Sequence, residues 1–400
     1  MELFDIVRSV IFIVILITVT IIVISKSEKS SIGFRVVIML LIIRLIYSIF
    51  RYWFNLPPDM PDIEFYEEQI NTFISNHMRL EVINPRFDVR NYIAFHGIIR
   101  YFFGNTWLVT VVLNSILGTF AIYNASNIAY EISGKKAKYA TYLFLSLEPT
   151  IFLYTNSHLR EAVVLFTITL AMVNLVKYIK YTNNKYIELY FLISIISGLF
   201  RAVNIFILIA IGLMSILLVR NKKQLGFKKV ITIILASLLG LLLLRVLENV
   251  LGFSVDIKYI NENLNRDMIG GGTMPYLVGE RYDSWTHLII SIPKRFLYFV
   301  LHPFPWDLSN VKHIIPFISS LYNVVFIIML IIFSRIKLKN CINYSLIKKV
   351  MAILLVALII YAVVKSESAS RHRLQFIWLL PVITSSIIFS ESIGDKENKK

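Results

Sequence analysis

The chain of 400 residues is 57% hydrophobic and only 16% charged, with a mean hydropathy of +0.69, which excludes an ordinary soluble globular protein. The net charge of +16 does not indicate a nucleic-acid partner, because Lys and Arg are concentrated in short turns between apolar runs. A single cysteine, Cys341, excludes an internal disulfide and a Cys-x-x-Cys metal or redox site.

Apolar runs long enough, or nearly long enough, to cross ~30 Å of hydrocarbon recur along the chain. They cover residues 6–25, 34–52, 105–131, 138–155, 160–178, 186–200, 203–219, 228–250, 312–334, 349–364 and 373–390. The sequence therefore predicts an all-α polytopic membrane protein with about eleven transmembrane helices. The first run lacks a small-residue cleavage site, so we expect a retained span and not a signal peptide. The short pair 186–200 and 203–219 predicts a tight hairpin with Arg201 near its outer tip.

The distribution of Lys and Arg predicts the orientation of these spans. Basic residues gather in the turns 26–35, 135–138, 177–185, 220–229 and 335–349 and in the tail 391–400. The positive-inside rule assigns these segments to the cytoplasm. We therefore predict one transmembrane domain over residues 1–390 in the bacterial cytoplasmic membrane, with extracytoplasmic loops at 53–104 and 251–311 and a cytoplasmic tail.

The first outer loop opens with an acidic cluster of Asp59, Asp62, Glu64 and Glu67. Carboxylates are costly in hydrocarbon, so they must face water, a cation or a substrate. A helix beginning near Asp62 would place Asp62 and Tyr66 on one face, which Ile70 and Phe73 continue as an apolar stripe. The alternative interpretation makes Asp62 the N-cap of that helix and gives the glutamates a solvated face.

The second outer loop contains an apolar segment, Trp285–Leu301, that carries Lys294 and Arg295 and ends in an aromatic stretch. This pattern predicts an interfacial helix that lies on the membrane. The triplet Gly270–Gly272 before it suits a mobile lid, because glycine leaves the backbone dihedrals unrestricted. No Lys-Ser/Thr follows the triplet, which disfavours a phosphate-binding loop.

Basic side chains also lie at the outer ends of apolar spans. They are Arg160, which precedes Glu161, then Arg201, and the run Arg371-His372-Arg373. Snorkelling to lipid headgroups explains a lone one. A convergent set of guanidiniums suits a phosphate-bearing substrate, because each offers paired donors. Arg44 and Arg245 are expected to have structural roles.

No cofactor is certain from the sequence. The seven histidines show no His-x-His or His-Glu-x-x-His spacing that would predict a zinc site. A divalent metal held by Asp or Glu stays an open alternative. No Gly-x-Ser-x-Gly motif in a suitable context indicates a serine nucleophile.

The order of these features resembles the GT-C fold glycosyltransferases that use polyprenyl-phosphate sugars, in particular the branch of the protein mannosyltransferases and the lipid A aminoarabinose transferase. The similar blocks are Asp62–Tyr66, Tyr101–Gly104 with Leu113–Gly118, Leu147–Ala162, Gly198–Arg201 and Ser370–Pro381. The resemblance covers most of residues 55–390 and implies a GT-C-type helix bundle. It also implies a sugar donor on a polyprenyl phosphate and an acceptor that is a glycan, a lipid or a protein.

The resemblance implies roles for individual residues. Asp62 is the expected general base of an inverting transfer, and Tyr66 is expected to line the sugar pocket. The expected substrate-binding set is Glu64, Arg160, Glu161, Arg201, Arg371, His372 and Arg373, with the arginines stabilising the departing phosphate. A lipid-linked polysaccharide polymerase or ligase is one alternative, and a flippase or transporter of lipid-linked sugars is another.

Overall fold

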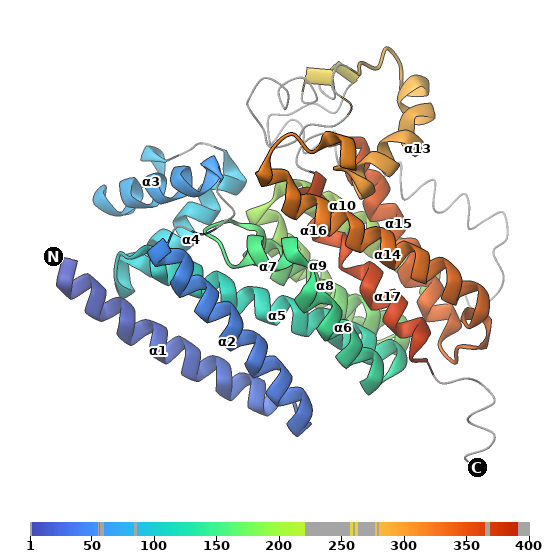
Figure 1. Cartoon of the computed structure of the whole chain (residues 1–400), viewed down its shortest axis with the longest axis horizontal. Coiled ribbons are helices and arrows are strands. Elements are labelled where there is room, and N and C mark those ends of the chain that lie inside the picture. The colour runs from blue at the N-terminus through green and yellow to red at the C-terminus, as the bar shows by residue number, and fades with distance from the viewer. Residues whose placement is uncertain are drawn as a thin grey trace. The chain divides into compact units, whose positions relative to one another are not determined.

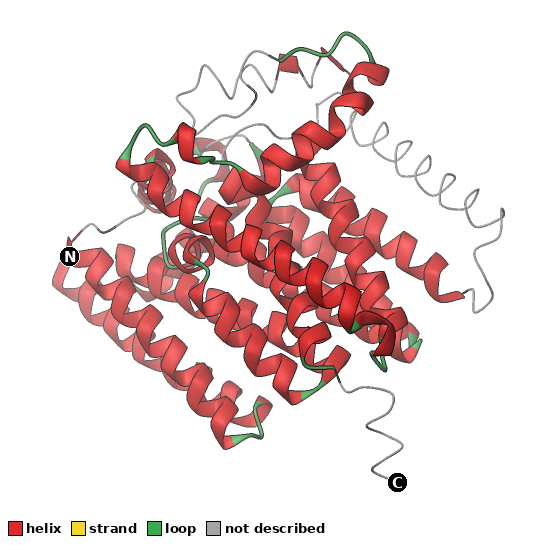
Figure 2. Cartoon of the chain, turned by 45° about the vertical axis from the view of Figure 1, so that its right-hand side comes forward, coloured by secondary structure: helices red, strands yellow, loops and turns green. Residues whose placement is uncertain are grey.

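The computed structural model describes residues 2–54, 56, 60–83, 86–220, 257–258, 261–262, 277, 280–364 and 369–390. Nearly all of these residues are helical, and none of them lies in a β-strand (Figure 2). Five expected features lie outside the described residues. They are the span 228–250, the turn Gly270–Gly272, Asp59, Arg245 and the tail 391–400.

Six helices in the described part of the chain are long and apolar enough to cross a membrane. They are α1 (Glu2–Ser27), α2 (Ser31–Phe54), α5 (Trp107–Ser133), α8 (Glu161–Tyr181), α14 (Ile314–Ile336) and α15 (Tyr344–Val364) (Figure 1). Each coincides with one of the apolar runs predicted above. The all-α character is therefore confirmed for the described residues, and their six candidate spans support a membrane protein, whereas the number of eleven spans stays a prediction.

Two expected spans are interrupted by proline. The run 138–155 forms α6 (Lys135–Leu147) and α7 (Pro149–Thr155), and the Glu148 side chain caps α7 by accepting from the backbone N–H of Ile151. The run 373–390 forms α16 (Ala369–Ile377) and α17 (Leu379–Ile388). Pro381 has no N–H to donate to the carbonyl four residues earlier, which favours the break near residue 378.

The predicted hairpin is present as α9 (Asn184–Phe200) and α10 (Ala202–Arg220), and Arg201 alone separates the two helices. The Tyr190 hydroxyl donates to the carbonyl of Leu208, and the Tyr190 ring also lies against Gly212. Because one residue of α9 meets this stretch of α10, the two helices pack directly on each other.

The chain divides into two compact units. The first comprises residues 1–125, 142–170 and 195–202, and the second comprises 126–141, 171–194 and 203–400. In the first unit, Phe12 of α1 stacks on Phe103 with ring centroids 4.3 Å apart. Gly104, at φ 111°, allows the backbone turn that brings Ser9 close, where a Cβ would overlap. The remaining length of α1 exposes a continuous apolar surface, as expected of a helix that faces lipid.

The first outer loop is mostly helical, with α3 (Pro61–Ser75), a short 3₁₀ turn η1 (Leu80–Val82) and α4 (Phe87–Phe103). The predicted apolar face of α3 is confirmed, since Tyr66, Ile70 and Phe73 are all buried. The alternative interpretation is wrong about the N-cap, because Met60 is the N-cap and Pro61 opens the helix, but Glu64 and Glu68 are exposed to solvent as it predicted. Proline favours the first helical position, so Asp62 lies inside the first turn.

In the second unit, the predicted helix of the second outer loop is α13 (Trp285–Leu301). Arg295 of α13 is buried. Its guanidinium is satisfied there by donating to the Ala362 carbonyl (2.9 Å) and to the Tyr282 hydroxyl (2.8 Å). Lys294 binds Glu280, so both basic residues of this apolar helix have partners. The 3₁₀ turns η2 (Pro305–Asp307), η3 (Val311–His313) and η4 (Leu338–Asn340) complete the described elements. That α13 lies on a membrane surface stays a prediction.

Candidate functional site

The packing of α3 on α4 positions the acidic residues of the first unit. The rings of Tyr66 and Tyr92 lie 4.8 Å apart, and further along both helices Phe73 fills the space beside Gly97. Glu67, next to Tyr66, reaches Arg100 near the other end of α4, so α3 lies across α4 and packs directly on it. Asp62 and Asp88 each lie one turn, ~6 Å of helix rise, before the tyrosine contact. Each carboxylate therefore lies near the start of its own helix.

Asp88 is a buried carboxylate held between two guanidiniums. Arg160 donates from Nη1 to Asp88 Oδ2 (2.7 Å), and Arg86 donates from Nε to Oδ1 (2.8 Å). Burial raises the pKa of Asp88, but the charges of Arg160, Arg86 and Arg201 outweigh it and hold the pKa below its ordinary value. Asp88 therefore stays ionised and fixes Arg160, which makes it a poor proton acceptor near neutral pH.

Glu161 and Arg201 form a second buried pair, in which Arg201 Nη2 donates to Glu161 Oε1 (2.8 Å). Glu161 opens α8, where a carboxylate is favoured by the helix dipole, and Arg201 occupies the break between α9 and α10. Arg201 also acts electrostatically on Asp88, so the two pairs form one charged cluster. The sequence predicted Arg160, Glu161 and Arg201 as site residues, and the structure brings them together.

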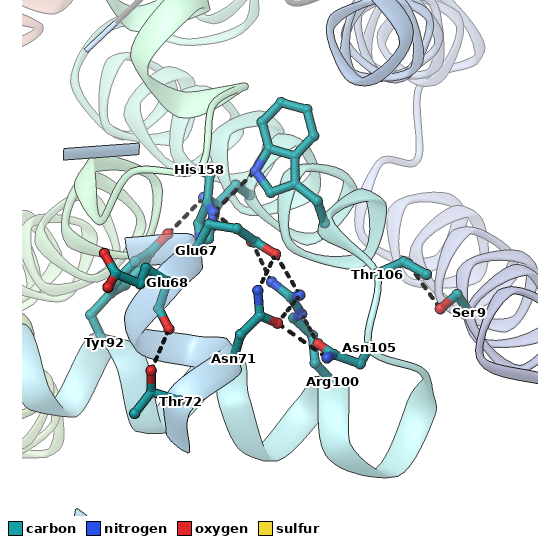
Figure 3. Close-up of polar contacts among 12 residues, drawn as sticks. Ser9, Glu67, Glu68, Asn71, Thr72, Tyr92, Arg100, Asn105, Thr106 and His158 are labelled. Atoms are coloured by element: carbon teal, nitrogen blue, oxygen red, sulfur yellow. Dashed lines mark hydrogen bonds and ion pairs between the residues drawn. The ribbon is translucent and has the colours of Figure 1, made fainter. Parts of the chain in front are cut away.

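A further polar cluster links α3 to the end of α4 (Figure 3). Arg100 is buried and grips Glu67 with two donors, Nη1 to Oε2 (2.6 Å) and Nη2 to Oε1 (2.8 Å). Its Nε donates to Asn105 Oδ1 (2.8 Å), and Nη2 also reaches Asn71 Oδ1 (3.2 Å). This fork geometry fixes the Glu67 carboxylate and makes it a structural partner of Arg100.

His158 lies in the turn between α7 and α8, fully buried beside Glu67. The indole N–H of Trp107 donates to His158 Nδ1 (3.0 Å), so this nitrogen accepts and the ring proton is on Nε2. Burial lowers the pKa of His158 well below its ordinary value, and the charges of Arg100 and Arg51 lower it further. The imidazole is therefore neutral, and the 3.4 Å approach of Glu67 Oε2 to Nδ1 is not an ion pair.

The C-terminal basic run lies in the second unit, on α16. Arg373 is buried and donates from Nη1 to the carbonyls of Val300 (2.9 Å) and His302 (2.6 Å). Its Nη2 donates to Ser320 Oγ (2.9 Å). His372 is also buried, and Arg371 is half-buried. The predicted approach of this run to Asp62 stays a prediction.

The other predicted residues lie on the first turns of α3. Asp62 is half-buried, Glu64 is exposed, and Tyr66 is buried against Tyr92 and His158. Sequence reasoning missed Asp88, Arg100 and His158 as members of the site. The sequence could have indicated Arg100, because a charged residue within the apolar stretch Ile98–Phe103 is expected to have a partner. Nothing in the sequence around Asp88 indicates its role, since its partner Arg160 is distant in the sequence.

Among the described residues, no group of three or more His, Cys, Asp or Glu side chains is placed to hold a metal ion. The two buried carboxylates of the charged cluster, Asp88 and Glu161, are already engaged by arginine. A divalent metal held by Asp or Glu therefore stays an untested alternative.

The fold and the site define an all-α protein with six candidate membrane-spanning helices in its described part, one unit of which encloses arginine–carboxylate pairs. Comparison with known proteins adds no family to this description. No protein-family model, no curated protein and no solved structure matches the chain.

Proposed function

We propose that the chain is a membrane glycosyltransferase that moves a sugar from a polyprenyl-phosphate carrier to an acceptor at the extracytoplasmic face. The observation that supports the proposal is the charged cluster of the first unit, Asp88–Arg160 with Glu161–Arg201. Guanidiniums fixed in place by buried carboxylates suit a phosphate ester, and a nearby carboxylate suits proton transfer.

Asp62 is the candidate general base, as the resemblance implies. Asp88, Glu161 and Glu67 are each bound by an arginine at 2.8 Å or less, which lowers their basicity. Asp62 lies half-buried in the first turn of α3, with its side chain open in part to water. It would take the proton of the acceptor hydroxyl as the oxygen attacks the anomeric carbon.

The rest of the reaction is a single displacement. The new bond joins the acceptor oxygen to the anomeric carbon, and the bond from that carbon to the phosphate oxygen breaks. The electron pair leaves with the lipid phosphate, so the configuration inverts and no covalent sugar–enzyme intermediate forms. Arg160 and Arg201 would stabilise the charge that develops on the phosphate, an effect of a few kcal/mol per well-placed donor.

The membrane environment supports a lipid-borne donor. Nucleotide sugars are charged and do not cross a bilayer, so a transferase whose site faces outward needs a sugar carried across on a lipid. Six candidate spans among the described residues provide apolar helix surfaces against which an isoprenoid tail can pack. The acceptor is a glycan, a lipid or a protein, with no nucleic acid involved.

The test is the release of polyprenyl phosphate from a radiolabelled donor by the purified protein with Asp62→Asn. Loss of the base is expected to lower the rate by about 10²–10⁴-fold without loss of folded protein. The matched control is Glu68→Gln, which removes a carboxylate from an exposed position of the same helix and should leave the rate unchanged. A near-normal rate for Asp62→Asn would remove Asp62 from the role of base.

A further inference from the structure

Several basic turns of the second unit meet around the end of α5. The Lys180 ammonium, at the end of α8, donates to the backbone carbonyl of Glu131 (2.6 Å) and to its carboxylate (3.0 Å). The carbonyl of the next residue, Ile132, accepts from the side-chain amide of Asn343, which lies just before α15. These contacts bring together residues 131–138, 177–186 and 335–348, which we call the lysine face.

The lysine face has a large excess of positive charge. Its exposed residues Lys135, Lys136, Lys185 and Lys339 form no ion pair within the described part of the chain. Glu131 is the one acidic residue in the three segments, and Lys180 already binds it. The face therefore attracts an anionic partner.

Aromatic rings place this charge at a membrane–water boundary. Lys348 lies over the ring of Tyr344, 4.9 Å from its centroid, and Lys180 lies 5.1 Å from that of Tyr181. The other lysines that lie over a ring in the described part of the chain are Lys138, Lys177 and Lys337, all of them on the lysine face. Tyrosine is enriched at the level of lipid headgroups, where a lysine beside it can reach water.

Exposed apolar side chains continue from the lysines along two helices. On α6, Leu143 and Leu147 follow Lys136 by seven and eleven residues, so all three share one side of the helix. On α9, Leu192 follows Lys185 by seven residues in the same way. A cation at the head of an apolar stripe matches a molecule with an anionic head and hydrocarbon chains. A soluble anion would use the charge alone.

We propose that the lysine face binds anionic phospholipids through the phosphates of their headgroups. The acyl chains would lie along the exposed leucines of α6 and α9. Lysine suits this role because its ammonium has three donors on a flexible stem, and basic clusters beside membrane spans attract anionic lipids. The inference goes beyond the proposed sugar transfer and does not rest on it, since the charged cluster belongs to the first unit.

The first test uses the unchanged protein. Purified protein is reconstituted in equal parts of phosphatidylglycerol and phosphatidylcholine, extracted into a zwitterionic detergent, and examined by native mass spectrometry for retained lipid. Phosphatidylglycerol should be retained about tenfold over phosphatidylcholine at low salt. The preference should shrink as sodium chloride rises from about 0.05 to 0.5 M, because salt screens exposed charges. Equal retention of the two lipids at low salt overturns the proposal.

The decisive variant is Lys135→Gln/Lys136→Gln. Both lysines are exposed and lie in the first turn of α6, where the helix dipole disfavours positive charge, so the variant should melt no lower than the wild type. It should lose about tenfold of the preference for phosphatidylglycerol. The control Arg79→Gln/Arg281→Gln removes two exposed charges from the two outer loops and should keep the preference. A preference that survives in the lysine variant contradicts the proposal.

A competition experiment separates a lipid headgroup from a free phosphate ion. Inorganic phosphate and sodium chloride are added to the wild-type protein at equal ionic strength. The two salts should displace phosphatidylglycerol equally, because the acyl chains contribute to its binding. Stronger displacement by inorganic phosphate would show that the face binds free anions, and it would overturn the assignment to lipid.

Discussion

At the scale of the residue, the charged cluster explains how arginines can be buried in a mostly apolar protein. Asp88 and Glu161 neutralise Arg160 and Arg201, so neither guanidinium is an isolated charge. Such pairs add little net stability, but removing one member leaves the other charge buried without its counterion. Removing a member of a buried pair should therefore destabilise the protein more than removing Asp62, which is only half-buried.

The first prediction concerns Asp88→Asn. Removing the carboxylate that binds Arg160 should lower the free energy of unfolding by about 3 kcal/mol, measured by thermal or denaturant unfolding in detergent. Asp62→Asn should lower it by less than Asp88→Asn does, because Asp62 is only half-buried. The double variant Asp88→Leu/Arg160→Met should recover most of the stability, since it removes both charges. A stable Asp88→Asn single variant would contradict the importance of the pair.

The second prediction is that His96 and His158 make the stability of the folded protein depend on pH. Their pKa values are lowered in the folded protein, mainly by burial, so the unfolded chain binds more protons below its ordinary histidine pKa of about 6.5. Keeping both histidines neutral therefore costs no free energy of unfolding above that pH. As the pH falls below it, the free energy of unfolding decreases. The melting temperature should therefore drop between about pH 7.5 and pH 5.5.

His96→Phe should flatten this pH profile, because one of the two buried titrating groups is gone. The exposed His77→Asn is the matched control and should leave the slope unchanged. Equal slopes for the wild type and His96→Phe would show that His96 is not buried in its neutral form. Asp88 does not interfere, because its lowered pKa acts at more acidic pH.

At the scale of the element, the close packing of α3 on α4 sets where the acidic residues lie. Gly97 has no side chain, and a Cβ there would overlap the ring of Phe73. The pattern of apolar residues predicted the buried face of α3, because a helix repeats every 3.6 residues. It did not predict that this face meets α4 and not lipid, since periodicity shows which face is buried and not what covers it.

The third prediction tests this contact. Gly97→Ala should destabilise the protein by about 1–3 kcal/mol through overlap with Phe73, despite the better helix propensity of alanine. Gly97→Ala combined with Phe73→Leu should recover part of the loss. Ile98→Ala, on the exposed side of α4, is the control and should have a small effect. If Gly97→Ala is as stable as the wild type, the helices do not pack as described.

At the scale of the whole molecule, the helices were largely predictable and the polar pairs were not. Six apolar runs and the helix over Trp285–Leu301 appear where the sequence placed them, because length and hydropathy are local properties. Arg160–Asp88 joins residues 72 positions apart, and Trp107–His158 joins residues 51 apart. Such pairs depend on tertiary packing, which a single sequence does not display.

The fourth prediction concerns the orientation of the chain. With Cys341→Ser as background, Arg79→Cys should react with a membrane-impermeant maleimide in intact cells, because the first outer loop is expected outside. Asn183→Cys, in a basic turn, should react only after the membrane is opened. Both positions are exposed on the protein surface, so access depends on the side of the membrane alone. The reverse labelling pattern would invert the predicted topology.

The account depends most directly on whether the protein breaks the bond between a sugar and a lipid phosphate. Purified wild-type protein in proteoliposomes, supplied with radiolabelled polyprenyl-phosphate sugars and an extract of envelope acceptors, should release one polyprenyl phosphate for each sugar transferred, with inversion at the anomeric carbon. Recovery of the donor intact, whether in its original leaflet or moved to the other, would contradict a transferase and favour a transporter.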